Sequence, residues 1–147
     1  MTTALAGKET AARLEKVFPA SIIESDRDYI VIKPEALLKV ISYLKATPEF
    51  DFNFLNDITS ADYFDYFEVV YHLSSMNSNK SLVVKTRVYG RENLVVPSIV
   101  DIYQGADFQE REIYDLMGIS FKGHPRMKRI MLWEGFEGHP LRKDYLG

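Results

Sequence analysis

Two runs of alternating apolar and polar residues constrain the fold of this 147-residue chain more than any other feature. They are DYFEVVYHLSS, which begins at Asp65, and KSLVVKTRVYG, which begins at Lys80. In a strand, alternate residues point to the same side. The apolar sides consist of Phe67, Val69, Tyr71 and Leu73 in the first run and Leu82, Val84, Thr86 and Val88 in the second. The polar linker MNSN between the runs predicts a hairpin, and each apolar face requires helices to cover it.

Helical periodicity supplies candidates for that cover. Pro34 stands at the first position of a predicted helix. Its apolar residues recur at i, i+3, i+4 and i+7, as Leu37, Val40, Ile41 and Leu44. A shorter amphipathic helix is predicted in TAARLEKVF, with Thr10 as its cap and Pro19 after its end.

Short β-rich runs and one further helix complete the pattern. SIIES and DYIVIK predict strands around an acidic turn, and FDFNFLNDITSADYF predicts a strand that leads into a loop. Ser98, with Asp101 three residues later, predicts a short helix that ends before Gly105. The expected class is α+β, with a single mixed or antiparallel sheet, helices packed on it and an irregular C-terminal tail. At this length we expect one domain over residues 1–147.

The stretch DFQEREIYDLMGISFKGHP, which begins at Asp107, concentrates acids, bases and aromatic residues. Asp107 with Glu110 is typical of a capping box, and Gly118 is placed to end a helix in the left-handed conformation, so residues 108–117 are predicted to be helical. The predicted core stripe contains Ile113, Leu116, Met117 and also Glu110. The opposite, solvent side is predicted to contain Phe108, Arg111, Glu112 and Asp115.

A carboxylate in a core stripe and an aromatic ring among charges both need an explanation. Glu110 is interpreted either as a capping carboxylate bonded to N–H groups at the helix start or as the receiver of an arginine from the tail. Arg111 and Asp115, four residues apart, are expected to form an exposed ion pair contributing about 0.3–0.5 kcal/mol. Phe108 on the charged side is a candidate anchor for a protein interface.

The sequence gives little support for chemistry within the chain itself. It contains no cysteine, which excludes disulfides, thiolate catalysis, cysteine-held zinc and a self-contained cysteine-held iron–sulfur cluster. None of the usual nucleotide, flavin or haem motifs is present. Glu110 and Glu112 lie about 200° apart on a helix, so they cannot converge on one substrate. His72 is expected to be a hydrogen-bonded structural histidine.

Histidine spacing and charge distribution bear on whether the chain binds a metal or nucleic acid. His124 and His139 could ligate a metal with Glu137 or Asp144, but no short histidine spacing supports such a site. Residues 119–147 carry six bases and three acids, whereas the whole chain has a formal charge of −3. The aromatic residues that interleave with these bases, as in stacking platforms, are Trp133, Phe136 and Tyr145. The acidic body disfavours nucleic acid and favours a protein partner that docks at the basic tail.

The segment from Val96 to Tyr145 resembles one known family. It reads VPSIVDIYQGADFQEREIYDLMGISFKGHPRMKRIMLWEGFEGHPLRKDY. The matching motifs are Glu110-Arg111-Glu112, Tyr114-Asp115-Leu116, Gly118-Ile119, Phe121, Gly123-His124-Pro125, Arg129-Ile130 and the run from Gly138 to Tyr145. The segment is similar to the core of the thirty-kilodalton subunit of proton-pumping NADH:quinone oxidoreductase, respiratory complex I. About a third of the chain carries the strong match, and residues 96–145 are the family core segment.

The resemblance implies an α+β subunit in the hydrophilic arm of the complex, beside the large, hydrogenase-like subunit that helps form the quinone site. Such subunits bind no cofactor; NADH, quinone, FMN and iron–sulfur clusters belong to other subunits. No catalytic or metal-binding residue is expected in this chain. The candidate partner-interface residues are Phe108, Glu110, Arg111, Glu112, Asp115, His124, Arg129, His139, Arg142, Lys143 and Asp144. Arg142, Lys143 and Asp144 would pair with the neighbouring subunit or fold back onto Glu110 and Glu112.

The resemblance also implies a place in the cell and leaves alternatives open. No signal peptide and no run of about 20 apolar residues is found, so we expect the chain on the cytoplasmic side of the inner membrane, attached peripherally through its partners. Many relatives continue after the motif that ends at Tyr145, and the resemblance does not extend to the contacts of such a tail. Related subunits occur with other electron donors and in membrane-bound hydrogenases. The alternative from another class is a free-standing acid–base or metal enzyme that uses Glu110, His124 and His139.

Overall fold

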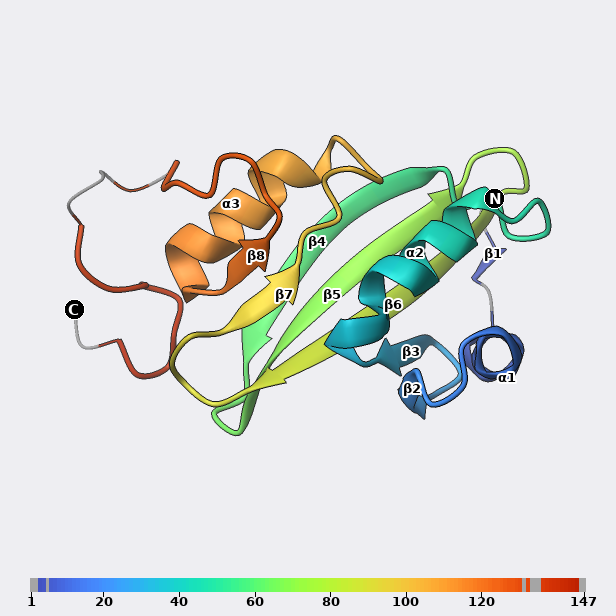
Figure 1. The fold of residues 1–147 in the computed structure, drawn as a ribbon, viewed down its shortest axis with the longest axis horizontal. Helices are drawn as coiled ribbons and strands as arrows, with labels where there is room; N and C mark the ends of the chain where they lie inside the picture. The colour runs from blue at the N-terminus through green and yellow to red at the C-terminus, as the bar shows by residue number, and fades with distance from the viewer. Residues whose placement is uncertain (1–2, 5, 131, 133–135, 146–147) are drawn as a thin grey trace.

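The hairpin forms the centre of a mixed sheet in the computed structural model, which describes residues 3–4, 6–130, 132 and 136–145 (Figure 1). The elements in chain order are β1 (Thr3–Ala4), α1 (Gly7–Val17), β2 (Ile22–Ser25), β3 (Tyr29–Ile32), η1 (Pro34–Ala36), α2 (Leu37–Ala46), β4 (Phe54–Asp62), β5 (Tyr66–Ser75), β6 (Lys80–Tyr89), β7 (Val95–Pro97), α3 (Ala106–Met117) and β8 (Ser120–Lys122). The strand order of the main sheet is β2-β3-β6-β5-β4, with β1 also paired to β6. The predicted α+β class is confirmed.

Strands β5 and β6 pair in antiparallel fashion from Tyr66 opposite Tyr89 to Ser75 opposite Lys80. The predicted alternation is confirmed, since every residue of the two predicted apolar sides is buried. Strand β4 pairs antiparallel to β5, whereas β3 pairs parallel to β6, so the sheet is mixed. The apolar face of these strands therefore carries the core.

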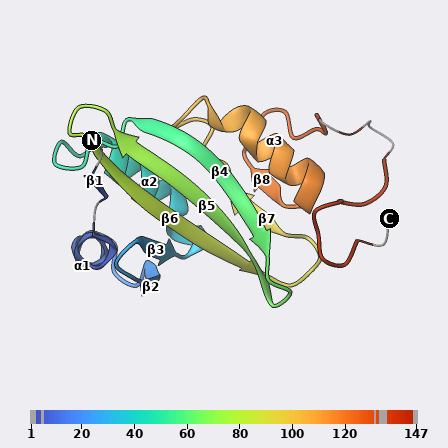
Figure 2. The same cartoon turned by 180° about the vertical axis from the view of Figure 1, so that it is seen from behind.

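Helices α2 and α3 lie across that face of the sheet, as Figure 1 shows. Seen from behind in Figure 2, strands β4, β5 and β6 lie in front of both helices. The predicted start of the α2 region at Pro34 is confirmed, because Pro34 opens the turn η1 that runs directly into α2. Its predicted stripe is confirmed as well, with Leu37, Val40, Ile41 and Leu44 all buried.

The cap predicted at Thr10 is wrong. Helix α1 begins at Gly7 with Ala6 as its N-cap residue, so Thr10 lies one turn inside the helix. Its hydroxyl donates to the Ala6 carbonyl oxygen at 2.9 Å, and the residue is buried. The hydroxyl therefore bonds backward to the preceding turn instead of capping the N–H groups ahead of it.

The short helix predicted at Ser98 is also wrong, since residues 98–105 contain turns and no helix. The Ser98 hydroxyl donates to Glu110 of helix α3, at 2.5 Å, and so makes a long-range contact. Strand β7 comes just before these turns and β8 comes after α3. The two strands pair in parallel as a separate two-stranded sheet that the sequence pattern does not predict. This small sheet brings the segment before the turns beside the segment after α3 (Figure 1).

Candidate interface around helix α3 and the tail

Helix α3 confirms the predicted helix and extends it by two residues at the start. Gly118 follows the last residue with φ of +77°, which confirms the predicted left-handed end. The predicted capping box is wrong, because the N-cap residue is Gly105 and no side chain caps the helix. Asp107 lies in the first turn, where its negative charge interacts favourably with the positive end of the helix dipole.

Glu110 is buried in the core stripe, as its position predicted, but both interpretations of its role are wrong. Its carboxylate accepts a hydrogen bond from the Ser98 hydroxyl at 2.5 Å and another from the Ile99 N–H at 2.9 Å. These donors belong to the loop before α3, not to the helix start or to the tail. Burial raises the pKa of Glu110, while the bonds from Ser98 and Ile99 act in the opposite direction. Glu110 thus fixes the loop onto the helix.

Asp115 is the largest departure from the predicted pattern, since it is fully buried instead of exposed. Its carboxylate accepts from the Arg129 guanidinium at 2.7 Å and from the N–H groups of Ile130 and Leu132 at 3.2 and 2.9 Å. The expected exposed pair with Arg111 is therefore not formed. Helical periodicity mispredicted the burial of Asp115 because the segment after α3 covers a second side of the helix through polar contacts. The pattern of apolar residues predicts only the side that packs against the hydrophobic core.

The two Gly-His-Pro turns contact opposite ends of α3. The buried ring of His124 lies with Nε2 at 3.0 Å from Oδ1 of Asp107. The Nδ1 atom of His139 lies 3.0 Å from the carbonyl oxygen of Asp115. Eight residues of helix separate these contacts by about 12 Å. His124 and His139 therefore do not converge with Glu110 on one substrate, as the alternative enzyme would require.

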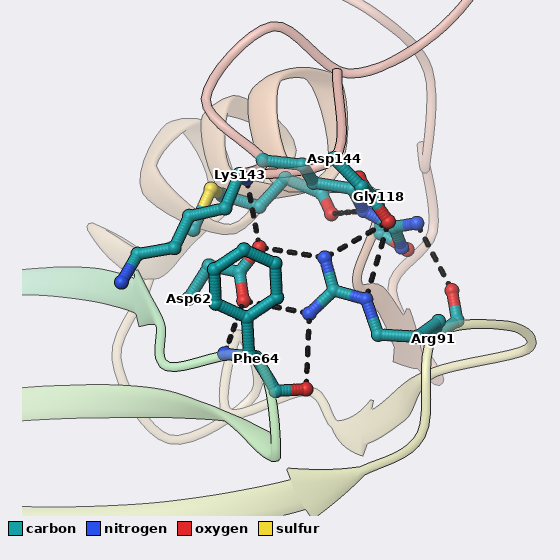
Figure 3. Close-up of polar contacts among 8 residues, drawn as sticks. Asp62, Phe64, Arg91, Gly118, Lys143 and Asp144 are labelled. Atoms are coloured by element: carbon teal, nitrogen blue, oxygen red, sulfur yellow. Dashed lines mark hydrogen bonds and ion pairs between the residues drawn. The ribbon is translucent and has the colours of Figure 1, made fainter. Parts of the chain in front are cut away.

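Arg91 holds the end of the tail against the strands, as Figure 3 shows. Its guanidinium donates to both carboxylate oxygens of Asp62, at 2.6 and 2.7 Å, and lies 2.9 Å from Asp144. Asp62 also accepts from the backbone N–H of Lys143 at 2.9 Å. We call Asp62, Arg91, Arg142, Lys143 and Asp144 the Arg91 clasp. A planar guanidinium with two parallel bonds to a carboxylate is the geometry that makes such pairs strong.

The electrostatics of the Arg91 clasp follow from its hydrogen bonds, which outweigh the effect of burial. The side chain of Asp62 is 2% exposed and that of Arg91 is 28% exposed. Hydrogen bonding to Arg91 holds the pKa of Asp62 far below its usual range, against the opposing effect of burial. Hydrogen bonding to Asp62 likewise raises the pKa of Arg91. Both groups therefore stay charged at neutral pH.

Arg142 joins the Arg91 clasp to helix α3. Its guanidinium donates to the carbonyl oxygens of Met117 at 2.6 Å and of Arg91 at 3.0 Å. The tail folds back, but not onto Glu110 and Glu112 as expected. Arg142 binds the carbonyl oxygens named above, the Lys143 N–H binds Asp62, and Asp144 pairs with Arg91. The sequence predicts a tail that folds back onto the chain, but it does not predict the contacts with Met117, Asp62 and Arg91.

Sequence reasoning missed Asp62, Arg91 and Ser98 as members of this site. Asp62 and Arg91 stand 29 residues apart at the ends of different strands, and a single sequence gives no signal that pairs them. The one weak signal for Asp62 is its position at the end of strand β4, which packs Leu55 and Ile58 into the core.

Of the remaining predicted residues, some are exposed and others have a hydrogen-bond partner within the chain. Phe108, 66% exposed, and Glu112 are on the surface as predicted. Arg111 donates to the carbonyl oxygen of Lys128 at 3.3 Å. The prediction for His72 is confirmed, since its Nδ1 lies 2.5 Å from Asp57. Trp133 lies outside the described residues.

Two kinds of feature are absent from the described part of the chain. Within residues 3–4, 6–130, 132 and 136–145, no three His, Asp or Glu side chains are grouped as a metal site would require. In the same part of the chain, no helix has the length and apolar character needed to span a membrane.

Sequence comparisons place the chain among respiratory proteins. The sequence model of the family described as "Respiratory-chain NADH dehydrogenase, 30 Kd subunit" matches residues 30–147. The probable NADH-ubiquinone oxidoreductase 30.4 kDa subunit of Candida maltosa is 44% identical over 90% of this chain and 48% of that protein. The corresponding NADH-quinone oxidoreductase subunit of Roseiflexus castenholzii is 38% identical over 96% of this chain and 84% of that protein. The chain thus spans about half the length of the fungal relatives it matches.

A solved structure shares the fold. A chain from the membrane-bound sulfane sulfur reductase, an archaeal respiratory membrane complex, matches with a TM-score of 0.75 over 94% of this chain and 84% of that chain. The two sequences are 23% identical, so this likeness establishes a common fold and nothing about the reaction.

Proposed function

Because this chain belongs to the family of the 30-kDa subunit of respiratory-chain NADH dehydrogenase, we propose that it is a non-catalytic structural subunit of a proton-translocating oxidoreductase. In this role it lies in the hydrophilic arm and braces the module in which electrons from NADH, or a related donor, reduce quinone. FMN, iron–sulfur clusters and the quinone site belong to its partners. The chain is held at the cytoplasmic side of the membrane through those partners.

One observation carries the non-catalytic part of the proposal: the buried acids of the site are bonded within the chain. Asp62 is bonded to Arg91, Glu110 to Ser98 and Ile99, and Asp115 to Arg129. A catalytic acid or base needs a route to a substrate proton, and these carboxylates are buried with their oxygens occupied by donors of the same chain. Such fully bonded networks fix one conformation, which is what a bracing subunit requires.

The geometry also sorts the candidate interface residues. Phe108, Glu112, Lys143 and Asp144 are exposed and Arg111 is half-buried, and these residues would contact the large quinone-site subunit. The other candidates are buried or half-buried and would shape the surface through their contacts within the chain; they are Glu110, Asp115, His124, Arg129, His139 and Arg142. A permanent interface of this kind is expected to bury more than about 2,000 Å².

Affinity purification of the tagged chain from detergent-solubilised membranes tests the proposal. We expect flavin- and cluster-bearing partners to co-purify together with NADH:quinone reductase activity. Arg142→Glu places a carboxylate against the carbonyl oxygens of Met117 and Arg91 and should remove both partners and activity. Lys16→Glu, on the exposed side of α1, is the control that should retain them. Recovery of the wild-type chain alone, or turnover of a substrate by it alone, would overturn the proposal.

A further inference from the structure

Three basic residues on helix α3 or in the segment after it have no ion pair with a described acid. Among the described residues, Arg13, Arg87, Arg91 and Arg129 each have a carboxylate within 4.0 Å. No described acid forms such an ion pair with Arg111, Arg126 or Lys128, although the segment that contains them is otherwise closely bonded. Like charges that lie together on one surface repel each other, and a partner surface that supplies acids would relieve this repulsion.

The segment that carries Arg126 and Lys128 contacts the helix side that carries Arg111 and the exposed ring of Phe108. The Arg111 guanidinium lies 5.7 Å from the centre of the Phe108 ring, and its Nε donates to the Lys128 carbonyl oxygen at 3.3 Å. The N–H of Arg126 donates to Nδ1 of His124 at 2.9 Å, while the other side of that ring contacts Asp107, next to Phe108. We call Phe108, Arg111, Arg126 and Lys128 the basic patch.

The acids nearest to the basic patch neutralise it only in part. Asp107 lies 3.0 Å from the buried His124 ring, and its side chain is 28% exposed. Glu112 is exposed and follows Phe108 by four residues, so it lies beside Phe108 on the same side of α3. The patch therefore presents three positive groups and an aromatic ring with fewer carboxylates than bases, so its net charge is positive.

We propose that the basic patch docks onto an acidic protein surface of a neighbouring subunit, with the ring of Phe108 entering an apolar pocket rimmed by carboxylates. This inference rests on the proposed function and names the chemistry of the partner at that interface. Arginine and aromatic residues are the types that most often anchor interfaces. A protein partner is favoured over nucleic acid or anionic lipid because the whole chain carries a formal charge of −3, which opposes attraction to an extended polyanion.

A charge-reversal pair with a matched control tests the patch. Arg126→Glu with Lys128→Glu should lower the recovery of partner subunits on the tagged chain about tenfold, because like charges would then face each other. Phe108→Ala should also lower recovery. The control is Lys8→Glu with Lys39→Glu, which makes the same change in net charge at exposed lysines of α1 and α2 and should recover partners like the wild type. Thermal melting of each purified chain verifies that it is folded.

Crosslinking and lipid binding distinguish the possible partners. A carbodiimide condenses an amine with a carboxylate in direct contact, so mass spectrometry should find Lys128 of the assembled complex joined to an Asp or Glu of a neighbouring subunit. Flotation of the wild-type chain with phosphatidylglycerol vesicles, lost in Arg126→Glu with Lys128→Glu, would assign the patch to lipid and overturn the inference. Equal recovery of partners by both double variants would overturn it while leaving the proposed function intact. Failure of the wild type to recover any partner would instead overturn the proposed function.

Discussion

The two Gly-His-Pro turns have the same three residues but are held in different ways. In the first, the buried His124 ring reaches the Asp107 side chain near the start of α3. In the second, His139 reaches the Asp115 backbone near the helix end, and the residues that follow enter the Arg91 clasp. The first turn is therefore fixed by one buried side chain, and the second by a network that spans the strands, the helix and the tail.

The acids beside the two turns differ in the same sense. Glu110, on the side of the first turn, receives two neutral donors from Ser98 and Ile99. Asp115, under the second turn, receives a guanidinium from Arg129 together with two backbone N–H groups. A buried carboxylate with a cation and several donors is well compensated, whereas one with neutral donors alone bears more of the cost of burial. The same motif thus marks two sites of unequal electrostatic strength.

Asp115→Ala should have the largest effect on this comparison. The substitution leaves the Arg129 guanidinium and the N–H groups of Ile130 and Leu132 without their acceptor, so the free energy of unfolding should fall by about 3–5 kcal/mol. Urea denaturation followed by circular dichroism measures the loss. Asp144→Ala is the matched control, because this aspartate is 44% exposed and its removal should cost about 0–1 kcal/mol. Equal losses would show that the second turn does not depend on a buried acid.

Arg91→Ala tests the clasp that only the second turn has. It leaves the buried Asp62 carboxylate without its bidentate partner, and the unfolding free energy should fall by about 2–3 kcal/mol. Hydrogen exchange should localise the change, with faster exchange at the Lys143 N–H and little change at the Arg126 N–H of the first turn. Uniform acceleration at both turns would contradict the separation drawn between them.

Gly138→Ala and Gly123→Ala compare the turns at equivalent positions. Both glycines have positive φ, +88° and +91°, so each alanine should cost about 1 kcal/mol in backbone strain. A Cβ at Gly138 would lie 2.9 Å from the Tyr145 ring, whereas a Cβ at Gly123 would meet nothing within 4 Å. Gly138→Ala should therefore lower the melting temperature further. Adding Tyr145→Ala to each variant should remove the difference, and a difference that persists would assign it to another cause.

The elements that the sequence predicted well are those whose pattern is complete within one segment. The stripe of α2 and the alternation of β5 and β6 each follow from a single periodicity, so no distant residue was needed to find them. Asp115 was misplaced because its partner Arg129 comes from a separate segment, 14 residues later. Arg91 and Asp62 were missed for the same reason, at a separation of 29 residues. Glu110 was placed correctly in the core, but its donors could not be known before the loop at Ser98 was seen.

Glu110→Gln should give the smallest effect, visible as a change with pH. Burial raises the pKa of Glu110 above its ordinary value of 4.5, so the folded state binds this proton more tightly than the unfolded state does. The wild type should therefore be most stable relative to Glu110→Gln below pH 4.5, and it should lose that advantage as the pH rises through the folded pKa. Urea denaturation of both proteins between about pH 4 and pH 8 measures the difference, since the rest of the chain titrates alike in both. If the stability of the wild type relative to Glu110→Gln instead rises with pH, Ser98 and Ile99 compensate the charge of Glu110 as fully as Arg129 compensates that of Asp115. The electrostatic contrast between the two turns would then be lost.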